Sequence, residues 1–169
     1  PNEIHLNIHE MTSVLTGRRE IKVRWDGNCF YRATARAVDG KTDEAHLTFR
    51  DMCNKMIAEY PDVFEPYLFN TKSVEEHVRK SVKAGTWVET IDIFSCATVL
   101  QCTILVNTVN SEKWTKFEPR VKCPATIAHN RACDCPFTLI LHDFNPAASH
   151  FNLLERLVSS GTEVHQHEA

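Results

Sequence analysis

The sequence WDGNCFYR, from Trp25 to Arg32, decides both the fold and the chemistry expected of this chain. A turn-forming Asp-Gly-Asn segment precedes a cysteine, and residues typical of a helix follow it, so we expect Cys29 to begin a helix. A helix start offers free backbone N–H groups and the positive end of the helix dipole, and both favour a thiolate over a thiol. A cysteine in a helix is often only a small buried apolar residue, but the turn before Cys29 favours a nucleophile.

The turn itself could supply a second part of a catalytic site. The backbone N–H groups of Asp26, Gly27, Asn28 and Cys29 could face the oxyanion that develops during acyl transfer. An aspartate before a glycine also often shapes a turn through local hydrogen bonds of its side chain. The two roles are compatible, because shaping the turn aims the oxyanion donors.

A nucleophilic cysteine needs a base, and the base needs a residue that orients it. The segment His150-Phe151-Asn152 offers both. On a strand, alternate side chains share a face, so His150 and Asn152 would project together, with Cα atoms roughly 6.6 Å apart. The Asn152 amide oxygen could then reach one imidazole nitrogen, and the other nitrogen would be free to face Cys29.

Each member of this pair has an alternative. His142-Asp143 is a rival base pair, and an adjacent acid is chemically superior to an amide. Neighbouring residues on a strand point to opposite faces, however, so Asp143 could not easily orient His142, and we prefer His150. Asn152 could instead be a solvent-facing strand residue.

These residues together resemble the signature of the ovarian tumour (OTU) family of cysteine deubiquitinases. The resemblance lies in the Asp-Gly-Asn-Cys turn, the Phe-Tyr-Arg that follows it, and the distal His-aromatic-Asn. Segment 87–97, WVETIDIFSCA, is similar to that family's Trp-Gly-containing stretch, which leads into a core helix bearing an acidic residue. Val88 and Glu89 stand where small residues or glycine are common, so we expect this loop to be shaped differently. The matches run in order from about residue 21 to 155.

The resemblance implies an α+β, papain-type cysteine protease fold, with a small central β-sheet flanked by helices. It also implies that the substrate is the C-terminal glycine of ubiquitin, or of a ubiquitin-like modifier, joined to a lysine. No cofactor or metal is implied. Trp87, Asp92 and Phe151 are expected to support the site without touching the scissile bond.

Length and composition agree with one catalytic domain. A chain of 169 residues can bury a proper core, and we expect a monomeric domain over 1–158 and a disordered polar tail over 159–169. The net charge of −3 gives no reason to expect nucleic acid as a partner, and no apolar run approaches the length of a membrane span. Since the chain starts at Pro1, we expect a processed protein or part of a larger one.

Cysteine usage favours a reducing compartment. The seven cysteines are odd in number and have no regular spacing, and no N-terminal stretch resembles a signal peptide, so we expect a cytoplasmic protein. Cys53, Cys96 and Cys102 sit inside helix or strand patterns and are expected to be buried apolar residues. Cys123, His129, Cys133 and Cys135 invite a zinc interpretation, but Cys133 and Cys135 are separated by one residue where zinc sites usually have two.

The remaining pattern predicts an α+β chain. Expected helices cover 5–15, 29–38, a segment from Thr42-Asp43 to before Pro61, a segment that Ser73 caps and Gly85 ends, and the apolar stretch 91–100. Expected strands cover 21–25, 102–106, an edge strand at 114–117, and the neighbours 137–141 and 150–154, joined at Asn145-Pro146.

The residues alone thus predict a thiol-dependent acyl hydrolase, in which Cys29 attacks a carbonyl and His150 moves the proton. Two other classes stay open. One is a catalytically weak ubiquitin-binding module, and the other is a cysteine protease or acyl transferase that acts on an unrelated substrate.

Overall fold

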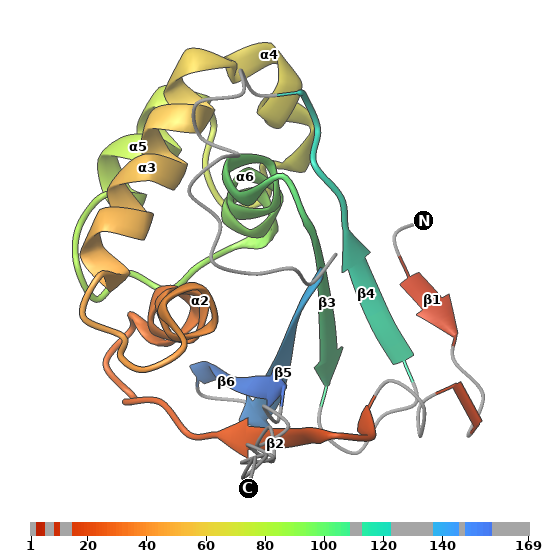
Figure 1. Cartoon of the computed structure of the whole chain (residues 1–169). Helices are drawn as coiled ribbons and strands as arrows, with labels where there is room; N and C mark the ends of the chain where they lie inside the picture. The colour runs from red at the N-terminus through yellow and green to blue at the C-terminus, as the bar shows by residue number, and fades with distance from the viewer. Residues whose placement is uncertain are drawn as a thin grey trace, which may run out of the picture.

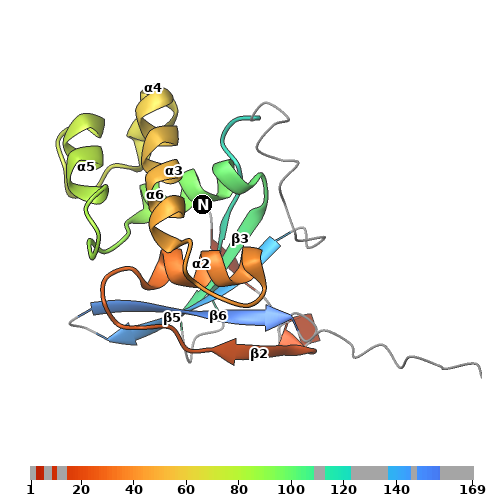
Figure 2. The ribbon, with the colours of Figure 1, turned by 60° about the vertical axis from the view of Figure 1, so that its left-hand side comes forward.

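The computed structural model of the chain places six strands and a group of helices into two layers (Figure 1). It describes residues 3–5, 9–10, 15–108, 113–122, 137–145 and 148–156. In Figure 2 the described helices lie together on one side of the sheet. The predicted α+β architecture, with a small sheet and packed helices, is confirmed.

The sheet has the strand order β1-β4-β3-β5-β6-β2. Strands β3 and β5 run parallel, and the other neighbouring pairs are antiparallel. The two predicted neighbours near the C-terminus are β5 and β6, as expected. The strands are β1 Glu3–His5, β2 Arg18–Ile21, β3 Thr103–Thr108, β4 Lys113–Phe117, β5 Phe137–Asn145 and β6 Ala148–Arg156.

The helices bury their apolar residues against this sheet and against one another. The predicted core helix is α6, in which every residue from Ile91 to Leu100 is buried. The predicted cap of α5 is also present, because the Ser73 hydroxyl accepts a hydrogen bond from the Glu76 N–H. The helices are α2 Cys29–Asp39, α3 His46–Glu59, α4 Pro61–Phe64, the 3₁₀ turn η1 Glu65–Tyr67, α5 Val74–Ser81 and α6 Thr90–Leu100.

The helix predicted over 5–15 is wrong at its first residue. His5 ends strand β1 and does not begin a helix, since Ile4 pairs with Trp114 of β4. Of the remaining predicted helix, His9, Glu10 and Leu15 are helical, and 6–8 and 11–14 lie outside the described residues. Strand β4 is consequently not an edge strand, because β1 covers its outer side.

Two element boundaries also differ, and side-chain hydrogen bonds explain both. Helix α3 begins at His46, after Thr42-Asp43, and the Asp43 carboxylate accepts from Arg32 without capping the helix. The strand expected over 21–25 is wrong except at Ile21, because β2 covers Arg18–Ile21 and its ladder with β6 stops there. Beyond that point the Val23 N–H donates to the Asn152 side chain, which replaces a backbone partner.

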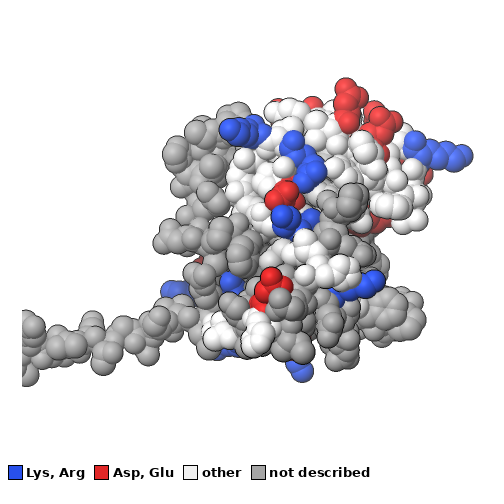
Figure 3. Space-filling model, turned by 90° about the vertical axis from the view of Figure 1, so that its right-hand side faces the viewer, with Lys and Arg blue, Asp and Glu red and all other residues white. Residues whose placement is uncertain are grey.

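Several predictions fall outside the described residues, namely Pro146 of the turn, the tail 159–169 and the set Cys123, His129, Cys133 and Cys135. Within the described ranges, no helix combines the length and the apolar character needed to cross a membrane. Lys and Arg side chains are interspersed with Asp and Glu on the face shown in Figure 3.

Candidate active site

Cys29 is the first residue of α2, as the sequence predicts, and the helix ends with a left-handed glycine at Gly40. Its side chain is buried against the sheet, and the backbone N–H of Phe151 in β6 faces its sulfur. This contact brings the N-terminus of α2 to the strand that carries His150. Segments that are more than a hundred residues apart in sequence therefore meet at one point.

The electrostatic environment of Cys29 differs from the expectation in one respect. Burial raises the pKa of the Cys29 thiol, although the N–H groups of Phe151, Phe30 and Cys29 itself act in the opposite direction. The helix-start donors do face the sulfur, as predicted, but desolvation outweighs them. Burial thus favours the thiol form of Cys29, so a base is needed to activate it.

His150 and Asn152 project from the same face of β6 and are both buried. The His150 Nε2 atom lies 2.7 Å from the Asn152 Oδ1 atom, which is hydrogen-bond distance. This contact was predicted from strand alternation. The prediction did not say which of the two imidazole nitrogens faces the amide.

The partners of Asn152 favour one tautomer of the His150 imidazole. Its Oδ1 accepts from the Val23 N–H at 3.1 Å, and its Nδ2 donates to the Glu20 carboxylate at 2.9 Å. With the amide oriented in this way, an acceptor faces the imidazole, so Nε2 carries hydrogen and Nδ1 is left as the acceptor. Nδ1 is buried and has no hydrogen-bond partner among the described residues, as a base awaiting a proton requires.

Trp25 contributes a contact that sequence reasoning missed. Its indole stacks on the His150 imidazole, with ring centroids 4.3 Å apart and planes at 10°. The side chain is 50% exposed, so it covers His150 from the solvent side. The one sequence feature that could have indicated this contact is the position of Trp25 directly before the predicted turn.

Asp26 shapes the turn before the nucleophile. Its carboxylate binds the Arg32 guanidinium at 2.6 Å and accepts a hydrogen bond from the Asn28 N–H at 3.1 Å. The hydrogen bond from Arg32 is the main reason that the pKa of Asp26 falls to about 2. Because Asp26 engages the Asn28 N–H, the Cys29 N–H, which faces the sulfur, is the first candidate for the oxyanion donor.

Arg50 of α3 also supports this turn. The sequence analysis did not identify it as a site residue. Its buried guanidinium donates to the Gly27 carbonyl and to the Asn28 Oδ1, each at 3.0 Å, and lies over the Tyr31 ring. The Asn28 Oδ1 also accepts from the Gly85 N–H at 2.8 Å. The nucleophile turn is thus tied to α3 and to the loop after α5.

Gly27 and Gly85 approach each other across this junction. Gly27 has a φ of +75°, and a Cβ atom placed on it would lie 1.9 Å from the Gly85 carbonyl oxygen. Only glycine fits there, for both conformational and steric reasons.

The three residues predicted to support the site have different positions. Asp92 is fully buried, and it accepts from the Glu89 N–H at the start of α6 and contacts His77 Nε2 at 2.8 Å. Phe151 packs edge-to-face on Phe30. Trp87 is 39% exposed, and this exposure does not support the predicted packing role.

His77 is an ionisable residue that contacts both Asp92 and Glu89. Burial lowers the pKa of His77, but the carboxylates of Asp92 and Glu89 outweigh it, and the net pKa is raised. Asp92 of α6 is thus joined to α5 through its hydrogen bonds with His77 and Ser81.

The rival pair His142-Asp143 lies on β5, next to the site. In the β5–β6 ladder His142 is opposite Phe151, and Asp143 is opposite His150. The side chains of both residues lie outside the description.

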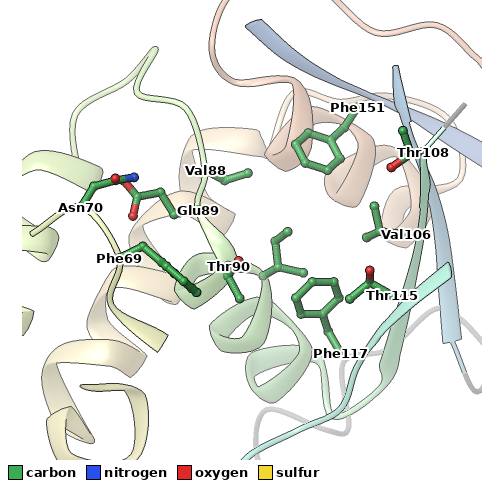
Figure 4. A pocket seen from close by; sticks show the side chains of 11 residues that line it. Phe69, Asn70, Val88, Glu89, Thr90, Val106, Thr108, Thr115, Phe117 and Phe151 are labelled. Carbon is green, nitrogen blue, oxygen red and sulfur yellow. The ribbon is translucent and has the colours of Figure 1, made fainter. Parts of the chain in front are cut away.

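A hollow of about 340 Å³ adjoins β6 on the Phe151 side (Figure 4). Phe69, Phe117 and Phe151 turn toward it, and Val88 and Glu89 from the loop before α6 form part of its wall. Neither Cys29 nor His150 lines it. The hollow is therefore a neighbour of the candidate site and separate from the reacting groups.

Comparison with known proteins finds both sequence relatives and similar structures. Residues 24–144 match the model of a family described as OTU-like cysteine protease. The ovarian tumor domain-containing deubiquitinating enzyme 7 of Arabidopsis thaliana is 30% identical over 98 residues, which are 58% of this chain and 26% of that protein. The chain thus spans about a quarter of the length of this curated relative.

Solved structures share the fold. The OTU domain of OTUD1 superimposes with a TM-score of 0.63 at 19% identity, covering 87% of this chain and 93% of that domain. The Hazara virus OTU bound to ubiquitin gives a TM-score of 0.62 at 17% identity, covering 86% of each chain.

Proposed function

Because this chain belongs to the family of OTU-like cysteine proteases, we propose that it is a deubiquitinase with a Cys29-His150-Asn152 centre. It hydrolyses isopeptide or peptide bonds at the C-terminal glycine of ubiquitin or a ubiquitin-like modifier. The observation that carries the proposal is the 2.7 Å contact between His150 Nε2 and Asn152 Oδ1, on the strand whose Phe151 N–H faces the Cys29 sulfur.

The hydrogen bonds of His150 and Asn152 support the following reaction. His150 Nδ1 takes the thiol proton of Cys29 as the sulfur attacks the carbonyl carbon of the scissile bond. The N–H groups at the start of α2 stabilise the oxyanion, and the imidazolium then protonates the departing lysine amine. Water cleaves the resulting thioester, with His150 as base, and Cys29 regains its proton.

The burial of Cys29 gives His150 and Asn152 their importance. A thiol whose pKa is raised by burial reacts slowly on its own, because the thiolate is the nucleophile. Transfer of its proton to Nδ1 creates an ion pair, and the Asn152 oxygen stabilises the imidazolium by accepting its Nε2 hydrogen.

The choice of ubiquitin as substrate is supported by the relatives. The Arabidopsis protein is named a deubiquitinating enzyme, and the Hazara virus OTU was solved with ubiquitin bound. We also propose a reducing, cytoplasmic location, because a cysteine nucleophile such as Cys29 must stay reduced to act.

Cleavage of ubiquitin chains with defined linkages tests the proposal. The parent protein should release free ubiquitin from at least one linkage type, whereas Cys29→Ala and His150→Ala should release none while keeping their fold by circular dichroism. Binding of ubiquitin without cleavage would favour the binding-module alternative. Cleavage of unrelated thioesters or peptides alone would favour a protease or acyl transferase with another substrate.

A further inference from the structure

An amide is an ambiguous partner for a catalytic histidine. A carboxylate presents an acceptor whichever oxygen faces the imidazole, but an asparagine that turns over presents its NH₂ group instead. In that orientation Asn152 could not accept the Nε2 hydrogen of His150, and the imidazole would be driven to the wrong tautomer. The site therefore needs something that fixes the orientation of the amide.

Two neighbours of Asn152 provide this in the structure. The Val23 N–H donates to Oδ1 at 3.1 Å, and the Glu20 carboxylate accepts from Nδ2 at 2.9 Å. A carboxylate is acceptor-only, so it tolerates just one end of the amide. The Val23 contact comes from a backbone N–H, whereas the Glu20 contact comes from a side chain, so only the Glu20 contact can be removed by a side-chain substitution.

The position of Glu20 follows from the β2–β6 ladder. Glu20 is opposite Leu154 in the register, two residues along β6 from Asn152, which is within reach of a long side chain. The arginines beside it bind elsewhere: Arg18 donates to the Leu154 carbonyl, and Arg19 pairs with Glu155.

We propose that Glu20 is a positioning residue, which fixes the orientation of the Asn152 amide and thereby the Nε2–H tautomer of His150. The inference rests on the proposed function, because its consequence is kinetic. Glu20 touches neither the nucleophile nor the base, and acts only through Asn152. The contacts thus run from Glu20 of β2 to Asn152 and from Asn152 to His150, whose Nδ1 is the proposed acceptor of the thiol proton.

The decisive experiment measures kcat and KM for ubiquitin cleavage with Glu20→Ala and Glu20→Gln, each in the parent and in Asn152→Asp. In the parent, Glu20→Ala should lower kcat about three- to tenfold with KM unchanged, and Glu20→Gln, which keeps an acceptor oxygen, should recover part of the loss. Arg19→Ala, on the same strand and with a side chain that is 58% exposed, is the matched control.

In Asn152→Asp the loss of kcat caused by Glu20→Ala should disappear or reverse. An aspartate has no orientation to fix, and the Glu20 carboxylate would repel it, so Glu20→Ala should raise kcat there or leave it unchanged. An equal loss in both backgrounds would mean that Glu20 only stabilises the β2–β6 pair, and would overturn the inference.

A nuclear magnetic resonance measurement checks the contact without relying on activity. The side-chain amide protons of Asn152 should exchange with water faster in Glu20→Ala than in the parent or in Arg19→Ala. Unchanged exchange would overturn the inference. A parent that cleaves no ubiquitin substrate would instead overturn the proposed function, and with it the kinetic role of Glu20. An active parent with unaffected Glu20 variants would overturn the positioning role alone.

Discussion

The indole of Trp25 lies flat against the imidazole of His150, with ring centroids 4.3 Å apart. One residue precedes the nucleophile turn and the other begins the base–orienter pair, so this stack joins the two halves of the site. Trp25 is 50% exposed, so its indole lies between solvent and one face of the imidazole.

Loss of this stack should weaken catalysis more than stability. An aromatic pair contributes about 0.5–1.5 kcal/mol, so Trp25→Leu should lower kcat/KM about two- to tenfold. Trp25→Phe keeps an aromatic face and should retain most of the activity. Steady-state kinetics on a ubiquitin substrate would show the difference, and equal losses in both variants would refute a stacking role.

The close approach of Gly27 to Gly85 predicts an unusually harmful alanine substitution. Gly27→Ala would place a methyl group 1.9 Å from a backbone oxygen, so the turn must move and activity should fall at least a hundredfold. Gly17→Ala is the matched control, because Gly17 has a similar φ of +73° but open space around it. Kinetics and thermal unfolding of both variants would separate steric conflict from backbone strain. Similar behaviour of the two would contradict the account.

Arg50 should be essential for stability because its guanidinium supports the turn before Cys29. Arg50→Met removes the buried donor to the Gly27 carbonyl and one of the two donors to the Asn28 Oδ1, and should cost about 3 kcal/mol or more in the free energy of unfolding. Lys55→Met, on the same helix, removes only an exposed ion pair with Asp51 and should cost less than about 1 kcal/mol. Urea unfolding would measure both, and comparable costs would show that Arg50 is not a key support.

Asp26 should make stability depend on acid pH. The pKa of Asp26 is lowered from 3.8 to about 2, so its contribution is present above pH 4 and is lost as the pH falls toward 2. The residue is partly exposed, and the contribution should be about 1 kcal/mol. In urea unfolding, the parent should be more stable than Asp26→Asn at pH 6, and the difference should shrink toward pH 2. A difference that does not change with pH would show that the charge has no role.

The sequence was sufficient for elements whose signals are local. The helix that begins at Cys29, the apolar helix α6 and the pairing of β5 with β6 all follow from periodicity and turn residues within a short window. Strand alternation alone also placed His150 and Asn152 on one face.

What the sequence could not provide depends on long-range packing. Glu20 meets Asn152 across 132 positions, and neither residue carries a local mark of the other. Arg50 resembles any helix-surface arginine until the fold buries it under the Gly27 turn. The raised pKa of Cys29 has the same origin, since a helix start predicts donors but not the desolvation around them.

The central claim is that Cys29 is the nucleophile and that ubiquitin is what it attacks. Reaction of the protein with a ubiquitin that carries a C-terminal electrophile tests both parts at once, with the product analysed by intact mass and peptide mapping. The account predicts a single adduct under reducing conditions, mapped to Cys29, and none in Cys29→Ala. An adduct mainly at another cysteine, or no adduct with a folded protein, would contradict it.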